Sequence, residues 1–170
     1  MADPALIPGP LDAWIPGQRW FANPSSDALE IEASLPLTLD GAVRTLFVRD
    51  ATPGAEAVYQ VPVTSRGGEL LDGPRTPEYV RVLLELLFAG AVAHGDLDDS
   101  AAEGTPIGWT GPPPVLRSAK VLSGEQSNTS VIVEAETADG APARIMLKLF
   151  RALHHGENPD VVLQSAIAAA

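Results

Sequence analysis

The run from Gly95 to Pro114, GDLDDSAAEGTPIGWTGPPP, most constrains how this chain can fold. It consists mainly of small, acidic and helix-breaking residues and ends in three consecutive prolines. Such a run is typical of a linker that is stiff at its end. The sequence therefore predicts a first domain at residues 1–104, a Pro/Gly linker at 105–114 and a second domain that begins at residue 115 and runs to 170.

The first part contains strand-like segments at residues 29–39, 42–50 and 57–65. The sequences LDGA and TPGA lie between them and supply turn residues, which favours an antiparallel meander. In the third segment Tyr59, Val61 and Val63 alternate with more polar side chains. This alternation predicts a sheet with one markedly apolar face.

A helix is predicted to begin after Thr76, which is suited to the N-cap position. Pro77 fits the first helical position, and Glu78 places an acid in the first turn, where the helix dipole favours it. Gly90 or Gly95 could end this helix. An apolar stripe at helical spacing could cover the sheet; it consists of Val80, Leu83, Leu84 and Leu87.

Large aromatic side chains gather near the N-terminus, in the stretch WIPGQRWFA at residues 14–22. Such a cluster usually pins a terminus onto a core, and a surface that stacks on a ligand is the alternative. We expect it to pack against the first sheet.

The second part has the order strand, loop, strand, hairpin, strand, helix. Strands are predicted at residues 115–122, 130–136 and 144–150, with a hairpin at Asp139-Gly140. The triplet Asn-Pro-Asp at 158–160 is expected to open a helix that runs to the end of the chain. The whole is therefore predicted to be α+β: an antiparallel sheet with a covering helix, followed by a β-β-β-α unit.

Composition limits the partners and the compartment of the chain. The formal net charge of −11 argues against nucleic acid, because phosphate backbones bind to basic surfaces. The absence of cysteine excludes disulfides and thiolate catalysis. The sequence shows neither a signal peptide nor a membrane-spanning run, so we expect a cytoplasmic protein that does not interact with membranes.

The turn SGEQSNTS, at residues 123–130, lies between two apolar runs. It lacks the Gly-Lys-Ser/Thr of a Walker loop and the glycine pattern of protein kinases. Its backbone amides and hydroxyl groups could nevertheless donate hydrogen bonds to a polyanion. The alternative is that it only connects two strands.

Lys148 strengthens the case for an anion site. In IMLKLF it shares one face of the predicted strand with Met146 and Phe150. A lysine among apolar neighbours in mid-strand is uncommon unless an anion compensates it, although lysines on edge strands are frequent. A phosphate-covering loop, two strands and then a lysine is the order found in the small lobe of protein-kinase-like enzymes.

The segments EQSNTSVIV, LKLFR and GENPDVVL together resemble the maltokinase-like group of sugar kinases, whose catalytic lobe is similar to that of aminoglycoside phosphotransferases. The sequences GQRWFA and YQVPV resemble the cap domain that precedes the kinase lobe in that group. The resemblance implies that residues 1–104 form the cap and residues 115–170 form part of the nucleotide-binding lobe. It also implies transfer of phosphate from ATP to the anomeric hydroxyl of maltose, which gives maltose 1-phosphate for α-glucan synthesis.

The same resemblance assigns the site residues. The turn would cover the phosphates of ATP and Lys148 would hold them; the turn consists of Ser123, Gly124, Glu125, Gln126, Ser127, Asn128, Thr129 and Ser130. The catalytic aspartate, the Mg²⁺ ligands and the sugar site would belong to a helical lobe after residue 170. No catalytic or metal-binding residue is therefore assigned in this chain, and we expect the chain alone to be inactive. Val162 stands where the family has the acid that pairs with the lysine.

Two alternatives stay open from the sequence. Related kinases with similar caps act on glucosamine, which is the nearest alternative substrate. A different class of function is a binding module, in which the cap docks a partner and the kinase-like half does not work. Trehalose synthase, with which maltokinases are coupled, is the partner that the resemblance suggests.

Overall fold

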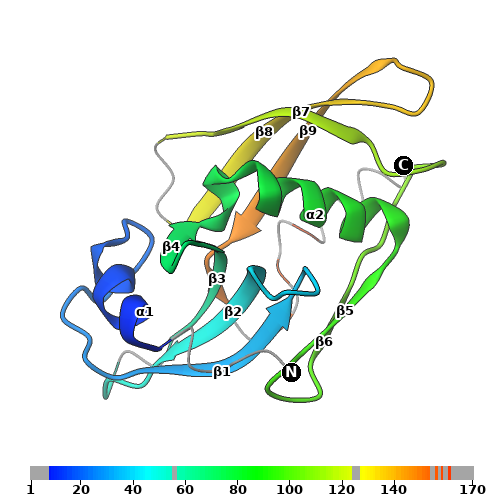
Figure 1. The fold of residues 1–170 in the computed structure, drawn as a ribbon. Helices are drawn as coiled ribbons and strands as arrows, with labels where there is room; N and C mark the ends of the chain where they lie inside the picture. Colours follow the sequence, from blue (N-terminus) through cyan, green and yellow to red (C-terminus); the bar gives the residue numbers. More distant parts are fainter. Residues whose placement is uncertain are drawn as a thin grey trace.

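The computed structural model describes residues 8–54, 57–123 and 127–153, together with residues 156, 158 and 161. Figure 1 shows the two larger of three antiparallel sheets with one long helix, α2 (Pro77–Ala89), running between them. The predicted α+β class is confirmed, including the sheet with a covering helix and the three strands that follow it.

The first sheet is built from β1 (Leu29–Pro36), β2 (Val43–Asp50), β3 (Ala57–Arg66), β4 (Glu69–Asp72) and β10 (Ala152–Leu153). The strand order is β1-β2-β3-β10, with β4 also paired to β3, and every pairing is antiparallel. The predicted meander is therefore confirmed over its three long strands. Strand β10 comes from the far end of the described chain and pairs with the start of β3.

Strand β4 was not predicted, although its turn left a signal in the sequence. Gly67 and Gly68 both have positive φ, +60° and +84°. Two consecutive residues of this kind make the two-residue hairpin turn that matches the twist of the flanking strands. The Gly-Gly pair could therefore have indicated the hairpin that joins β3 to β4.

The second sheet has three strands, β7 (Val115–Val121), β8 (Asn128–Glu136) and β9 (Pro142–Phe150), in that order. All three predicted strands and the hairpin at Asp139-Gly140 are confirmed. Strand β8 begins two residues earlier than predicted, so Asn128 and Thr129 belong to the strand rather than to the turn. The helix predicted from residue 158 lies outside the described residues, apart from single positions.

Helix α2 begins and ends as the sequence indicates. The side chain of Thr76 accepts a hydrogen bond from the backbone of Tyr79 at 3.4 Å. Gly90 ends the helix with a left-handed backbone (φ +60°), so the alternative end at Gly95 is wrong. Within the described chain, no helix combines the length and apolar character that crossing a membrane requires.

Helix α2 packs against both sheets. Its buried face belongs to one core cluster with Val43 of the first sheet and with side chains of β8 and β9. Of the predicted stripe, Val80 and Leu84 are each 1% exposed, and Leu83 and Leu87 are partly buried against the same cluster. The helix therefore covers the first sheet as predicted, and it also joins that sheet to the second part.

A second core cluster lies on the opposite face of the first sheet. The predicted apolar face of β3 is confirmed, since Tyr59, Val61 and Val63 are 3%, 0% and 1% exposed. Helix α1 (Pro8–Trp14) and Phe21 cover this face, and the rings of Trp20 and Tyr59 lie 5.9 Å apart. The aromatic cluster packs against the first sheet, as we expected.

Regular structure continues up to the start of the predicted linker at residue 105. The strands β5 (Val92–His94) and β6 (Ala101–Glu103) form an antiparallel hairpin. The second of them lies within the run that begins at Gly95. Further along, the Trp109 ring packs on Phe88 of α2 with ring centroids 4.8 Å apart. Its indole N–H donates to the carbonyl of Pro112 at 3.1 Å, which holds the proline-rich end close to the helix.

Candidate functional site

Lys148 lies in the middle of β9 on the face of the second sheet that points away from α2. The alternation predicted for this strand is confirmed, because Leu147 and Leu149 are buried and Lys148 and Met146 are exposed. The ammonium of Lys148 lies 5.3 Å from the centroid of the Phe150 ring. This face therefore offers a cation beside an aromatic ring.

The end of the predicted turn comes next to this lysine. Ser130 pairs directly with Lys148 across β8 and β9, and directly opposed residues project to the same face of a sheet. Asn128 is opposed in the same way to Phe150. By strand register Ser130 and Asn128 lie on the lysine face, where Ser130 is 3% exposed and Asn128 is half-buried. Gly124, Glu125 and Gln126 lie outside the described residues.

Thr129 faces the opposite way. It is 7% exposed, and its hydroxyl accepts a hydrogen bond from Nε of Arg151 at 2.8 Å. The backbone N–H of Arg151 donates to the carbonyl of Ser127 at 3.0 Å. Arg151, which the sequence analysis did not single out, therefore holds the end of the turn by two hydrogen bonds.

Arg151 is 1% exposed, which is unusual for an arginine. Its Nη2 donates to the carboxylate of Asp72 at 2.6 Å, and its guanidinium lies 4.9 Å from the centroid of the Trp20 ring. Both partners belong to the N-terminal part, far away in sequence. Arg151 follows the strand segment LKLF, but nothing local in the sequence indicates that Asp72 is its partner.

A polar cavity of about 280 Å³ opens between the turn and the N-terminal part. Ser123, Asn128 and Thr129 contribute one wall. Arg19 and Arg75, both exposed, contribute to the wall from the N-terminal part, together with Trp20 and Asp72. Three predicted site residues thus also border a space that lies between the two parts of the molecule.

No group of three or more His, Cys, Asp or Glu side chains within the described part of the chain is arranged to hold a metal ion. His154 and His155 lie outside the described residues.

Comparison with known protein families shows to which family the N-terminal part belongs. A family model described as the maltokinase N-terminal cap domain matches residues 14–104, more than half of the chain. The chain belongs to the maltokinase family. The sequences GQRWFA and YQVPV, on which the resemblance to the cap partly rested, lie within the matched residues. The turn at 123–130 and Lys148 lie beyond them.

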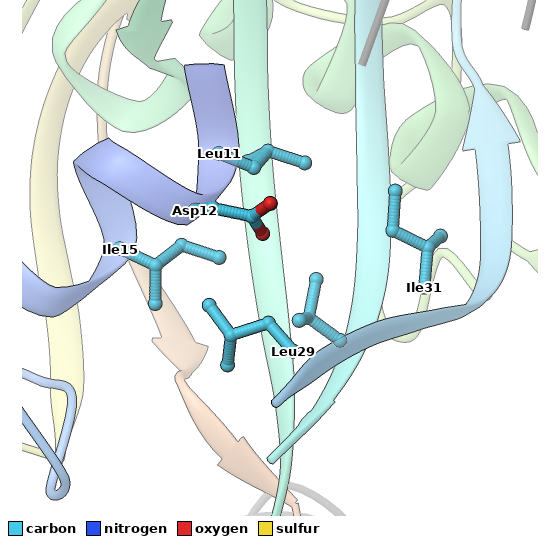
Figure 2. A pocket seen from close by; sticks show the side chains of 6 residues that line it. Leu11, Asp12, Ile15, Leu29 and Ile31 are labelled. Atoms are coloured by element: carbon cyan, nitrogen blue, oxygen red, sulfur yellow. The ribbon is translucent and has the colours of Figure 1, made fainter. Parts of the chain in front are cut away.

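The maltokinase cap contains an apolar cavity of about 230 Å³ between α1 and the first two strands. Figure 2 shows Leu11 and Ile15 on one side of it and Leu29 and Ile31 on the other. The carboxylate of Asp12 projects from α1 into this apolar surrounding. The cavity lies beside β1, which is the edge strand of the first sheet.

Helix α2 carries a buried tyrosine on the face that packs on the first sheet. Burial raises the pKa of Tyr79 to about 12, and the hydrogen bond between its hydroxyl and that of Thr45, 2.9 Å long, offsets this only in part. Tyr79 is therefore neutral at physiological pH, and its role in the cap is to join α2 to β2.

Proposed function

We propose that this maltokinase-like chain forms the cap and the phosphate-binding strands of an ATP-dependent sugar kinase. In this proposal the turn at 123–130 covers the phosphates of ATP, and Lys148 neutralises their charge. The observation that carries the proposal is the direct pairing of Ser130 with Lys148 in a protein with a maltokinase cap. A hydroxyl and an ammonium on one face suit a phosphate, which accepts hydrogen bonds from both.

The proposed reaction joins the anomeric hydroxyl of maltose to the γ-phosphorus of ATP. The bond between that phosphorus and the β–γ bridging oxygen breaks, ADP leaves, and the hydroxyl proton passes to a base. The described residues fit the phosphate-binding half of this chemistry. In our proposal the Mg²⁺ ligands, the base and the sugar site belong to a helical lobe after residue 170. We also propose a cytoplasmic location, where ATP is available to the reaction.

A phosphoryl-transfer assay tests this function. The full-length protein is given ATP and Mg²⁺, with maltose and glucosamine offered in parallel. We expect maltose 1-phosphate as the product. If only glucosamine is phosphorylated, the proposed substrate is wrong and the proposed kinase activity is right. If neither sugar is phosphorylated by well-folded protein, the proposed substrate class is wrong.

Lys148→Met tests the phosphate assignment within the same assay. We expect turnover to fall by about 10² or more, because a charge that stabilises the transferred phosphoryl group is lost. Arg144→Met is the matched control, since Arg144 is a cation on the same strand and face, roughly 13 Å further along. Equal activity of Lys148→Met and the wild type would contradict the assignment.

The apolar cavity of the cap favours a second candidate, an interaction module. A cavity lined by Leu11, Ile15 and Ile31 beside an edge strand could receive an apolar side chain of a partner. Trehalose synthase is the partner we propose to test. Size-exclusion chromatography should show a complex that Ile31→Asp abolishes and Glu85→Gln, an exposed change on α2, preserves. Co-elution unaffected by Ile31→Asp would exclude this cavity.

A further inference from the structure

We propose that Arg151 is a positioning residue through which the cap sets the geometry of the phosphate-binding turn. This inference rests on the proposed function, because it concerns the same site. Arg151 follows Lys148 by three residues, and it touches both the cap and the turn.

On the cap side, three separate groups fix the arginine. Asp72 accepts from its Nη2 at 2.6 Å, and the side chain of Asp72 is only 13% exposed. The Trp20 ring lies against the guanidinium, at 4.9 Å from the ring centroid. The backbone N–H of Gln60 donates to the carbonyl of Arg151 at 2.7 Å. Backbone and side chain of Arg151 are thus both anchored to the first sheet and its surroundings.

On the turn side, two contacts hold residues of the proposed phosphate site. The N–H of Arg151 donates to the carbonyl of Ser127 at 3.0 Å. Its Nε donates to the hydroxyl of Thr129 at 2.8 Å, which turns Thr129 toward the cap. The next residue, Ser130, then projects to the Lys148 face because side chains alternate along a strand. A shift of the guanidinium would therefore shift the turn.

The electrostatics indicate that this link serves geometry. A buried guanidinium needs a counter-charge, and Asp72 supplies it. Within the described chain, Nη1 of Arg151 has no hydrogen-bond partner although it is buried. Buried ion pairs contribute little net stability compared with apolar packing, but removal of one partner is costly. Such a pair is better suited to fixing one arrangement of cap and turn than to stabilising the fold.

The experiment compares Asp72→Asn, Arg151→Gln and the double variant in the full-length enzyme. We expect each to raise KM for ATP by about tenfold, the scale of one charged hydrogen bond, and to leave KM for the sugar unchanged. Asp72 also pairs with the exposed Arg75 at 3.5 Å, so the double variant should resemble Arg151→Gln alone only if Asp72 acts through Arg151. The double variant leaves no unpaired charge buried, because both partners are neutral. It can therefore be tested even if one of the single variants folds poorly.

Asp96→Asn is the matched control. Asp96 also pairs with a buried arginine of the cap, Arg44, at 3.3 Å, and among the described residues the other side-chain hydrogen bonds of Arg44 go to Gly41 and Ser34 rather than to the turn. We expect Asp96→Asn to lower the melting temperature without changing KM for ATP. As a readout that needs no nucleotide, amide hydrogen exchange at Ser127–Ser130 should become faster in Asp72→Asn and stay unchanged in Asp96→Asn.

The outcomes separate the two proposals. If Asp72→Asn only lowers the melting temperature, with KM for ATP and amide exchange at the turn unchanged, Arg151 is purely structural and the inference is wrong. Lys148→Met would still show its loss of activity in that case. If Lys148→Met keeps full activity, the phosphate assignment fails, and the positioning role of Arg151 fails with it.

Discussion

Asp50, at the end of β2, shows at the residue scale how this fold satisfies a buried charge. It is 0% exposed, and its carboxylate accepts hydrogen bonds from Asn23 Nδ2 at 2.9 Å and Ser26 Oγ at 2.8 Å. Burial alone would raise the pKa of Asp50, but hydrogen bonds from Thr52, Asn23 and Ser26 outweigh burial and lower it. The ionised carboxylate therefore ties the loop before β1 to the sheet.

This lowered pKa predicts a dependence of stability on pH. Because the pKa of Asp50 is lower in the folded than in the unfolded state, its contribution is present above the unfolded value of about 3.9 and is lost as the pH falls through the folded value. Urea unfolding of the wild type and of Asp50→Asn should therefore differ most near neutral pH and converge in acid. Parallel stability curves from neutral to acidic pH would contradict this prediction.

The sequence could indicate residues whose partners are local, and it could not indicate the others. Thr76 and Gly90 interact with their own helix, so their roles could be predicted from position alone. Lys148 stood out because its strand alternates. Arg151 and Asp72 come together only after two sheets have formed, and no sequence pattern joins residues so far apart.

At the scale of elements, long strands and α2 were predictable and short strands were not. β5, β6 and β10 have only two or three residues each, too few for an alternation to be recognised. They owe their conformation to the strands beside them: β5 and β6 pair with each other, β5 lies against β1, and β10 pairs with β3. Breaker residues from Gly95 onward indicated a linker. One of them, Gly104, allows close packing on α2, and Trp109 from the same run packs on Phe88.

Gly104 gives a test at this scale. A Cβ at this position would lie 2.0 Å from the carbonyl oxygen of Leu86, and the N–H of Gly104 donates to the carbonyl of Ala91 at 2.9 Å. Since the obstacle is helix backbone, Gly104→Ala should lower the free energy of unfolding by about 3 kcal/mol. Gly17→Ala, with no atom within 4 Å of the added Cβ, is the control and should change it by less than about 0.5 kcal/mol. Similar denaturation midpoints for both variants would show that α2 can move away.

At the scale of the whole molecule, α2 belongs to the cap in sequence and to both sheets in packing. Its core cluster includes Tyr79 and Leu84 together with Val131 and Leu149 of the second sheet. The cap and the strands that carry the proposed phosphate site therefore share one hydrophobic core. We expect them to unfold together.

Leu84→Ala tests this cooperativity. Leu84 is 1% exposed, so the change should lower the free energy of unfolding by about 2–5 kcal/mol. Fluorescence of the cap tryptophans, Trp14 and Trp20, should report the same shifted midpoint as amide exchange in β8 and β9. Two separate transitions, of which only one moves, would show that cap and second sheet are independent.

The pairing of β10 with β3 has a consequence for how the protein is made. Ala152 pairs with Tyr59. One edge of the start of β3 therefore lacks its partner strand, β10, until the ribosome has synthesised nearly all of the described chain. Pairings between residues so distant in sequence form late and slowly. During synthesis this sheet edge is open, and open edges are where nascent chains pair wrongly. A truncated product that ends before β10 would keep that edge permanently exposed and should tend to aggregate.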